Sequence, residues 1–297
     1  MTETYSMPDI CCIGHITHDK VITPKFEAHM PGGTAYYFAK ALARFDHSTF
    51  QLITAVGDDN NAVIDELRAD GLNVTVLPSR HSVFFENKYA ENMADRTQRV
   101  LAKADPFTTG NLVGAKARIF HLGTLLADDF SFEVIRHLSV IGIVSVDIQG
   151  YLRKVIGDKV YPVDYDLKRE AMPYIHILKA NEMEMEVLTG ISDPYDAARK
   201  LADWGCREVL LTLGDKGSLI YADGNFYEIP AITAKEVVDT TGCGDTYMAG
   251  YLYMRARGAS YQDSGTFAAA MCTLKLERKG PFDGTQADVE ALIGSQI

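Results

Sequence analysis

The chain has 297 residues, of which 47% are hydrophobic and 23% charged, a composition that excludes a disordered chain and supplies enough apolar side chains for a sizeable core. Acidic residues outnumber basic ones, 40 against 29, which gives a net charge of −11. Because a negative protein repels phosphate backbones and the sequence has no long Lys/Arg run, nucleic-acid binding is excluded as the default function.

The cysteine pattern and the amino terminus indicate the compartment. The five cysteines form no CxxC pair and no Cys/His cluster, so neither a disulfide framework nor a structural zinc site is expected. The sequence has no basic segment followed by an apolar stretch at its start, and no window approaches the roughly 18 apolar residues of a spanning helix. We expect a cytoplasmic protein with reduced thiols and no membrane partner.

Short apolar runs of strand length alternate along the chain with amphipathic stretches of helix length. The predicted strands are 10–16, 51–56, 119–122, 143–146, 175–178 and 209–213, and the predicted helices are 34–45, 62–70 (ending at Gly71), 130–140, 182–188 and 197–204. Continuous apolar strands are typical of a parallel sheet that helices cover on both faces. The pattern therefore predicts an α/β fold with a doubly wound, mainly parallel sheet.

One segment, residues 81–104, departs from this alternation. Two β-like runs flank the polar residues 90–96, which predicts a hairpin that projects from the body together with part of a strand around 74–77. Small sheets on α/β enzymes often act as lids or dimer surfaces, although a plain edge hairpin without a gating role is the alternative. We expect one domain over 1–297, with a lid inserted at 74–104, and a homodimer.

The most informative stretch is VVDTTGCGDTYMAG, residues 237–250. Gly242, Cys243 and Gly244 precede a helical pattern, so their backbone N–H groups can converge on one anion with help from the helix dipole. Asp245 falls in the first turn, where a carboxylate can accept a proton from a hydroxyl that attacks a bound phosphate. The alternative is an ordinary helix start, in which Asp245 only complements the dipole.

This stretch does not stand alone, because further motifs occur in a fixed order along the chain. They are GHITHD (14–19), Gly32-Gly33 before a helix, Asn-x-x-Glu (181–184), Thr-x-Gly-x-x-Gly (212–217), Asp-Thr-Thr-Gly-x-Gly-Asp-Thr (239–246) and Arg-Lys-Gly (278–280). The set resembles the signature of the ribokinase (PfkB) family of carbohydrate kinases over nearly the whole chain.

The resemblance implies a role for each motif. Asp245 is the expected base, with Gly242, Cys243 and Gly244 around the transferred phosphoryl group. The remaining positions are Asp19, Gly32 and Gly33 for the acceptor, Asn181, Thr212, Gly214 and Gly217 for the nucleotide, Glu184 together with Asn181 for water-bound Mg²⁺, and Asp239, Thr241, Arg278 and Gly280 for a monovalent cation such as K⁺. For Asn181 and Glu184, a capping pattern on a surface helix is the alternative.

Three departures from the family pattern concern the acceptor, and one of them is that residues 60–62 stand where a glycine is common. Tyr37 stands where ribokinases have an asparagine, and Asp147, Gln149 and Arg153 form an Asp-x-Gln-x-x-x-Arg stretch similar to the inositol-kinase-like branch. We expect Tyr37, Asp147 and Arg153 to contact the acceptor. The alternative for Arg153 is a surface ion pair with Asp158 or Asp164.

The sequence lacks the motifs of two other classes of nucleotide-binding protein. The sequence contains neither a P-loop nor the Gly-x-Gly-x-x-Gly of dinucleotide-binding proteins, and the scattered histidines are interpreted as structural. Cys243 lies in the anion site, but the resemblance implies that only its backbone takes part.

The sequence therefore predicts an ATP-dependent kinase that transfers the γ-phosphoryl group to a hydroxyl of a small polyol, a sugar or a cyclitol. Within the family the alternatives are a 2-keto-3-deoxy sugar-acid kinase or a nucleoside kinase, since Tyr36, Tyr37, Phe84 and Phe85 can line a larger pocket. A non-catalytic regulator that binds sugar or nucleotide is the alternative from another class.

Overall fold

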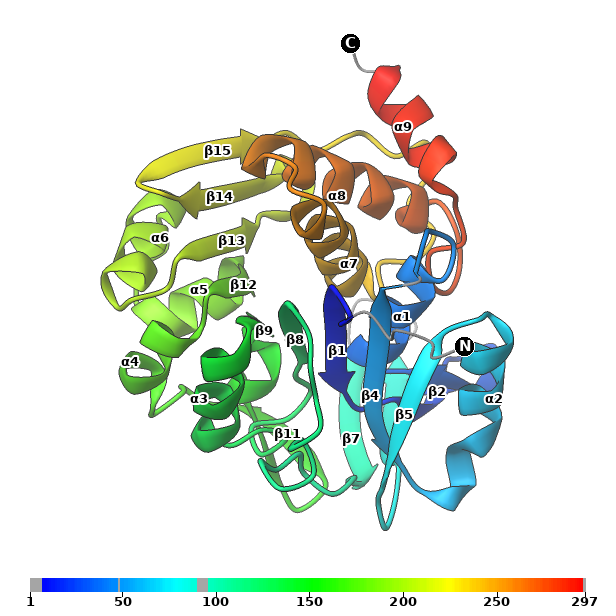
Figure 1. Ribbon diagram of the computed structural model, residues 1–297. Coiled ribbons are helices and arrows are strands. Elements are labelled where there is room, and N and C mark those ends of the chain that lie inside the picture. Colours follow the sequence, from blue (N-terminus) through cyan, green and yellow to red (C-terminus); the bar gives the residue numbers. More distant parts are fainter. Residues whose placement is uncertain (1–6, 48, 90–95, 296–297) are drawn as a thin grey trace, which may run out of the picture.

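A large sheet forms the body of the protein. The computed structural model describes residues 7–47, 49–89 and 96–295. Within these residues the large sheet has nine strands (Figure 1). In their order across the sheet they are β15 (Asn225–Ile229), β14 (Ser218–Ala222), β13 (Glu208–Thr212), β12 (Ile177–Asn181), β9 (Ile143–Asp147), β8 (Ile119–Gly123), β1 (Ile10–Gly14), β4 (Phe50–Val56) and β5 (Asn73–Pro78).

The large sheet is parallel except at one edge. All pairs from β5 to β13 are parallel, whereas β14 and β15 run antiparallel to their neighbours. The chain builds β4 and β5 on one side of β1 and then returns to add β8, β9, β12 and β13 on the other. This confirms the predicted doubly wound fold, and the strand order reverses between β1 and β8, where open α/β sheets bind their ligands.

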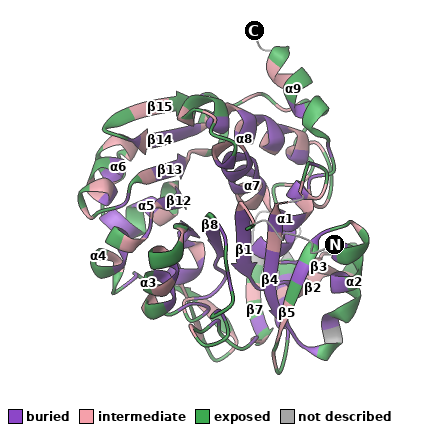
Figure 2. Cartoon of the chain, viewed as in Figure 1, coloured by how far each residue is buried: buried purple, intermediate pink, exposed green. Residues whose placement is uncertain are grey.

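Helices cover both faces of the large sheet. They are α1 (Thr34–Leu42), α2 (Asn61–Ala69), α3 (Phe132–Ile141), α4 (Lys168–Ala171), α5 (Glu182–Thr189), α6 (Pro194–Asp203), α7 (Cys243–Ala256), α8 (Tyr261–Leu276) and α9 (Gln286–Gly294). One apolar core lies under α1, α2, α7 and α8, and a second lies under α3, α5 and α6. Figure 2 shows β1, β4 and α7 as largely buried. None of the described helices has the length and apolar character needed to span a bilayer.

The predicted elements exist, with small shifts at their ends. The strand expected at 175–178 begins at Ile177, because Ile175 still closes a turn with Met172. Helix α6 begins earlier than predicted, at Pro194, because the Asp193 side chain caps it by accepting the Asp196 N–H at 2.9 Å. Gly71 follows α2 with a φ of +85°, as its predicted place after the helix requires.

A second sheet projects from the body, and the predicted lid was only part of it. The predicted hairpin is present as β6 (Val83–Tyr89) and β7 (Arg96–Ala102), and the link between its strands, residues 90–95, lies outside the described residues. The lid sheet, as we name it, runs in the order β10 (Arg153–Ile156), β11 (Lys159–Pro162), β7, β6, β2 (Thr17–Ile22) and β3 (Glu27–Gly32).

The boundary expected at residue 74 was wrong. Residues 74–77 lie in β5, which pairs with β4 at the edge of the large sheet, because their alternating buried side chains pack on α2. The strands β2, β3, β10 and β11 were not predicted. They are short and half exposed, so their sequences show no continuous apolar run.

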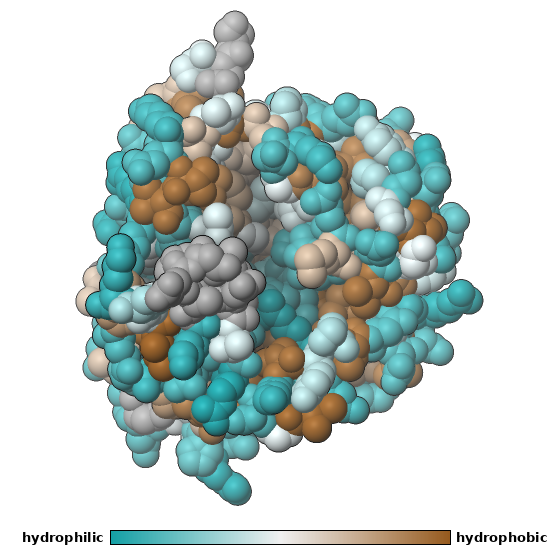
Figure 3. All heavy atoms as spheres, turned by 180° about the vertical axis from the view of Figure 1, so that it is seen from behind, coloured by the Kyte–Doolittle hydropathy of each residue, from teal (hydrophilic) through white to brown (hydrophobic). Residues whose placement is uncertain are grey.

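The side of the molecule opposite to the view of Figure 1 is mainly hydrophilic. Figure 3 shows several separate hydrophobic patches there and a hollow near the centre of this face. The protein thus presents a concave, largely polar surface on this side.

Candidate active site

The predicted anion site lies at the start of α7. Gly242 precedes the helix with a φ of +75°, a conformation that favours glycine. A Cβ atom at Gly242 would come within 2.2 Å of Cδ1 of Tyr37, so the backbone and the Tyr37 ring are in close contact. The N–H of Cys243 makes a long contact of 3.4 Å with the Thr240 carbonyl. Glycine is thus needed at position 242 because its φ is positive and because a Cβ would clash with the Tyr37 ring.

Asp245 stands in the first turn of α7, half-buried among charged groups. Desolvation and the neighbouring Asp147 carboxylate raise the pKa of Asp245 to about 7, while Lys179 and Arg153 act in the opposite direction. A carboxyl group with a pKa near 7 can exchange a proton with a substrate at neutral pH. These electrostatics are what a general base requires.

Lys179 is a residue of the candidate site that our sequence reasoning missed. It lies on β12 opposite Asp147 of β9, and its Nζ is 3.0 Å from Asp147 Oδ2 and 3.9 Å from Glu184 Oε2. Desolvation lowers the pKa of Lys179, but the two carboxylates outweigh it and the net shift is upward. The Nζ is also 3.0 Å from where a Cβ of Gly244 would stand, so a buried ammonium borders the anion site. A lysine inside the apolar run ILKAN was the available signal.

Asn181 and Glu184 form a capping box at the start of α5. Asn181 Oδ1 accepts the Glu184 N–H at 2.9 Å, and Glu184 Oε2 accepts the Asn181 N–H at 2.8 Å. Desolvation raises the pKa of Glu184, and Lys179 opposes this. The capping alternative therefore describes the local geometry, yet the same carboxylate lies beside Lys179 and Asp147 at the carboxyl ends of β9 and β12.

The groups expected around the acceptor lie where the lid sheet meets the body. A Cβ at Gly32 would come 2.7 Å from Asp19 Oδ2 and 2.8 Å from Thr17 Oγ1. Gly33, with a φ of +90°, is the N-cap of α1, and a Cβ there would lie 2.6 Å from the His15 carbonyl oxygen. The glycines thus allow the lid strands and α1 to approach closely.

Buried hydroxyl groups surround the same glycines. The side-chain oxygens of Thr17 and Thr34 are buried and make no hydrogen bond with any described residue. Because an unsatisfied buried hydroxyl costs about 1–3 kcal/mol, such groups are usually retained where a ligand or water binds them.

The four aromatic residues proposed for a nucleoside pocket do not all share one environment, although the rings of Tyr36 and Tyr37 pack edge to face at 5.6 Å. Burial raises the pKa of Tyr37, with Asp239, Asp19 and Asp245 adding to it, so Tyr37 stands between the acceptor and phosphate groups. Tyr36 instead lies next to Glu66 of α2. Phe85 pairs with Asp19 across the lid strands, whereas Phe84 packs against His18 at 5.2 Å.

Arg153 faces the site and does not form the surface pairs that were the alternative for it. Asp158 binds Arg99, and Asp164 binds Lys168. With the Gln149 amide oriented to satisfy its neighbours, its oxygen accepts from the Arg153 guanidinium, and Arg153 also lowers the pKa of Asp245.

The segment predicted to bind the nucleotide lies beside Asn181. Thr212 ends β13 and pairs with Asn181, and Gly214 begins the turn that follows. Gly217 has a φ of +95°, and a Cβ there would lie only 2.1 Å from the Ile229 carbonyl oxygen. This segment therefore follows β13 at the same edge of the sheet as Glu184.

The side chain of Lys275, from α8, reaches into the predicted cation loop. Asp239 accepts the N–H groups of Thr241 (2.9 Å) and Gly280 (3.0 Å) through its carboxylate. The fully buried Lys275 side chain donates to the Asp239 carbonyl at 2.7 Å. The Arg278 side chain is exposed and binds Asp283 at 2.7 Å.

The remaining candidates have packing roles. Burial raises the pKa of Cys243 to about 11, which disfavours a thiolate nucleophile there. Burial also lowers the pKa of His121 to about 4, and His121 stacks on Phe38 at 4.7 Å. Among the described residues, no group of three or more His, Cys, Asp or Glu side chains gathers to hold a metal ion.

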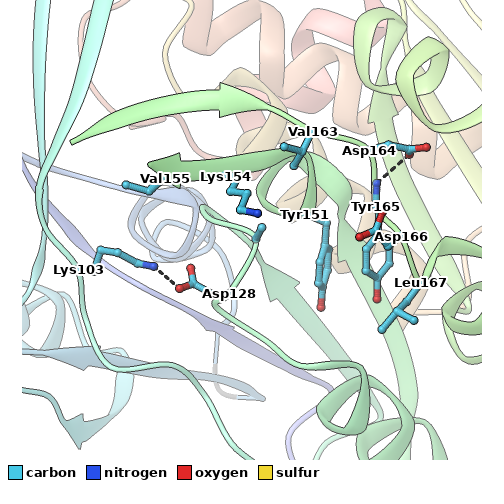
Figure 4. Close-up of a pocket in the computed structure, with 11 residues that line it drawn as sticks. Lys103, Asp128, Tyr151, Lys154, Val155, Val163, Asp164, Tyr165, Asp166 and Leu167 are labelled. Carbon is cyan, nitrogen blue, oxygen red and sulfur yellow. Dashed lines mark hydrogen bonds and ion pairs between the residues drawn. The ribbon is translucent and has the colours of Figure 1, made fainter. Parts of the chain in front are cut away.

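A separate pocket of about 600 Å³ lies elsewhere, between β10 and residues 163–167 (Figure 4). Lys103, Asp128, Tyr151 and Tyr165 are among its lining residues, and none of the predicted site residues lines it. The candidate site is therefore defined by its chemistry and not by this pocket.

A carboxylate next to a helix N-terminus and a buried ammonium is an arrangement suited to phosphoryl transfer. The chain matches the family described as pfkB family carbohydrate kinase over residues 7–287. It therefore belongs to this family, the ribokinase family, and is a carbohydrate or nucleoside kinase, a phosphotransferase with a hydroxyl acceptor.

Individual relatives differ in their substrates. A cytidine kinase of Thermococcus kodakarensis is 30% identical over 274 residues, which cover 86% of this chain and 92% of that protein. A solved pyrophosphate-dependent kinase of the ribokinase family, complexed with a pyrophosphate analogue and myo-inositol, is 26% identical with a TM-score of 0.82, covering 95% and 99% of the two chains. An Arabidopsis thaliana ribokinase complexed with ribose and ATP is 20% identical with a TM-score of 0.80, covering 97% and 99%, and shows the shared fold.

Proposed function

We propose that this kinase transfers the γ-phosphoryl group of ATP to a hydroxyl of a small polyol, a sugar or a cyclitol, with Asp245 as the general base. The observation that carries the proposal is the pair of contacts at the anion site. Gly242 packs against Tyr37 on the acceptor side, Gly244 lies next to Lys179 on the phosphate side, and Asp245 follows them in the first turn of α7.

The chemical step follows from the position of Asp245. Its carboxylate takes the proton of the acceptor hydroxyl as the hydroxyl oxygen bonds to the γ-phosphorus, and the bond from phosphorus to the β–γ bridging oxygen breaks. ADP leaves with that electron pair. A pKa of about 7 lets Asp245 be ionised before the transfer and hold the proton afterwards.

Fixed positive groups stabilise the charge on the transferred phosphoryl group. The backbone N–H groups at Gly242, Cys243 and Gly244 act in the manner of an oxyanion hole. The ammonium of Lys179 and the guanidinium of Arg153 add full charges, which the buried setting strengthens.

Magnesium fits the carboxylates at the ends of β9 and β12 only through water. Lys179 already occupies the space between Asp147 and Glu184, so a direct three-ligand site is disfavoured. Asn181 and Glu184 would hold Mg²⁺ by way of its water shell, and the ion would neutralise phosphate charge there. Catalysis by this chain's own residues rests on Asp245, Lys179 and Arg153.

The acceptor is held between the lid sheet and α1 in this proposal. Asp19 and the N–H of Gly33 bind its hydroxyls, and the unsatisfied Thr17 hydroxyl supplies a further partner. We further propose that the lid sheet closes over the acceptor and excludes water, which otherwise hydrolyses the donor.

The donor assignment rests on the segment from Thr212 to Gly217. This Thr-x-Gly-x-x-Gly turn resembles a nucleotide segment, and it lies beside Asn181. The pyrophosphate-dependent relative makes inorganic pyrophosphate the competing donor.

A second candidate acceptor is a pyrimidine nucleoside. It is favoured by the 30% identity to a cytidine kinase and by the aromatic Tyr37 at the site where ribokinases have an asparagine. A base needs an apolar surface against which to stack, and Tyr37 and Phe85 are the candidates for it.

We also propose that the protein forms a homodimer. The lid strands and the loops beside them expose Phe26, Leu101, Ile156 and Tyr161, which a second lid can cover. Light scattering at several concentrations tests it, and a constant monomer mass would contradict it.

A matrix of donors and acceptors tests the proposed function. ATP and pyrophosphate are each offered with myo-inositol, ribose, fructose, ketodeoxygluconate, adenosine and cytidine, and the phosphorylated product is measured. We expect turnover with ATP and a sugar or cyclitol. Turnover only with pyrophosphate would overturn the donor, and turnover only with a nucleoside would overturn the acceptor. As a control, Asp19→Asn should raise the KM of the acceptor while the KM of the donor stays unchanged.

A further inference from the structure

Lys275 carries a buried positive charge that the proposed mechanism does not use. It lies in the last turn of α8 and is only 1% exposed. Its Nζ is 2.7 Å from the carbonyl oxygen of Asp239 and 3.3 Å from Asp239 Oδ2. The Asp239 carboxylate also accepts the N–H groups of Thr241 and Gly280, so the ammonium lies within the loop formed by 239–241 and 278–280.

This is the loop to which the family resemblance assigned a monovalent cation. The residues present do not fit that ion together with Lys275. An ion bound to the Asp239 carbonyl would meet a like charge at the same oxygen, and two buried cations this close repel strongly. A buried lysine also needs its partners, because removing them leaves an uncompensated charge.

An ammonium group is a suitable replacement for the ion. It carries the same single charge as K⁺, and it binds carbonyl and carboxylate oxygens by hydrogen bonds. Lys275 is tethered by α8, so no binding from solution is needed to fill the loop.

The loop is coupled directly to the anion site. Residues 239–241 run into Gly242, so an ammonium that holds the Asp239 carbonyl also fixes the start of α7. A second link comes from Cys272, one turn before Lys275, whose thiol contacts the Cys243 carbonyl at 3.0 Å. The charge in the loop thus has a role in positioning the N–H groups of the anion site.

We infer that the Lys275 ammonium takes the place of the monovalent cation in this loop, so that the enzyme does not require K⁺. The inference rests on the proposed function for its kinetic part, and on the Asp239 contacts alone for its structural part. Lys275 is a positioning residue, because it acts through the Asp239–Gly242 segment.

The first measurement uses the wild-type protein. Its kinase rate and its Tm are recorded in buffers containing only tetramethylammonium, and then with K⁺, NH₄⁺ or Na⁺ at matched ionic strength. We expect changes of less than about twofold in rate and no specific rise in Tm with K⁺. A rate or a Tm that rises specifically with K⁺ would overturn the inference.

The second measurement uses Lys275→Met, which removes the charge and keeps the apolar stem. We expect the rate to fall by at least about tenfold and K⁺ or NH₄⁺ to restore part of the rate and the Tm. Lys40→Met, which removes another half-buried lysine paired with Glu66 and Asp70, should lose stability without recovery by K⁺.

The outcomes separate this inference from the proposed function. If no donor and acceptor pair turns over, the proposed function fails, and the Tm series still decides whether Lys275 fills the cation loop. If Lys275→Met does not fold, the wild-type series decides alone. If neither K⁺ nor NH₄⁺ restores the rate or the Tm of Lys275→Met, the inference that the Lys275 ammonium replaces a bound cation is contradicted.

Discussion

The phosphate side and the acceptor side of the candidate site satisfy their polar groups in different ways. On the phosphate side, Lys179 lies between Asp147 and Glu184, so these three charges are paired inside the protein. On the acceptor side, the hydroxyls of Thr17 and Thr34 are buried without a hydrogen bond to any described residue. The charges of Lys179, Asp147 and Glu184 are paired before substrate binds, whereas the acceptor side has buried hydroxyls that a ligand can satisfy.

This difference follows from what each side must do. Phosphoryl transfer always develops the same charge, so positive groups must be fixed in advance and must be held by carboxylates. Acceptors differ from one kinase to another, so the acceptor side offers partners that only the right ligand satisfies. The predictions below test whether the two sides are separable in this way.

The largest effect is expected from Gly242→Ala. The new Cβ meets the Tyr37 ring and forces the N–H groups of the anion site to move, so kcat should fall by about 10² or more. Gly258→Ala is the matched control, because Gly258 also has a positive φ of +80° but has open space around its Cβ position. Both variants should lose stability in thermal melts, and only Gly242→Ala should lose turnover. Equal losses of turnover in the two variants would contradict a specific role of Gly242 in the anion site.

Lys179→Met should come next. It removes the ammonium beside Gly244 and leaves Asp147 and Glu184 without their shared counter-charge, so kcat/KM should fall by about 10². The loss also removes an influence that lowers the pKa of Asp245, so the pH–rate profile should move to higher pH. Lys40→Met again serves as the control, with lower stability but an unmoved profile. A variant with normal kcat/KM would exclude Lys179 from the phosphate side.

The pH dependence of kcat/KM sharpens the role of Asp245. A general base works when ionised, and the pKa of Asp245 is raised to about 7, so kcat/KM should fall about tenfold per unit as the pH drops below 7. Initial rates between pH 5 and 9, in buffers of constant ionic strength, measure this dependence. The midpoint of the fall should lie within about one pH unit of 7. A flat profile down to pH 5 would contradict a base with a raised pKa.

The smallest effect is expected on the acceptor side. Thr17→Val replaces an unsatisfied hydroxyl by a methyl group of the same shape, so the free protein should keep or gain stability. The KM of the acceptor should rise by about tenfold while the KM of ATP stays constant. Thr189→Val removes a hydroxyl that donates to the Met185 carbonyl at 2.8 Å, so this control should lose stability with both KM values unchanged. An unchanged acceptor KM in Thr17→Val would remove Thr17 from the acceptor side.

The fold and the glycine-rich start of α7 were the parts that the sequence could predict. Buried parallel strands have continuous apolar runs, and the glycines around Asp245 are required by backbone geometry, so both leave a local signal. The large sheet and the start of α7 at Cys243 agree with that signal.

The remainder depends on contacts between distant segments. Lys179 and Lys275 are single lysines in apolar stretches, and only the folded chain brings them to Asp147 and Asp239. The lid was underestimated because β2, β3, β10 and β11 are half exposed and join strands far apart in sequence. The surface pairs considered for Arg153 fit its sequence neighbours, whereas the fold turns the guanidinium toward Gln149 and Asp245.

Turnover by Asp245→Asn tests the central claim most directly. The variant should fold, and its Tm relative to wild type should rise between about pH 4 and 7 and then level off, because the raised pKa means that the charged carboxylate costs stability in the folded state. Asp196→Asn, in the exposed first turn of α6, is the matched control with unchanged kcat. We predict that kcat of Asp245→Asn falls by about 10²–10⁴ while ATP binding stays nearly intact. A folded Asp245→Asn protein that keeps most of its wild-type kcat would contradict the account.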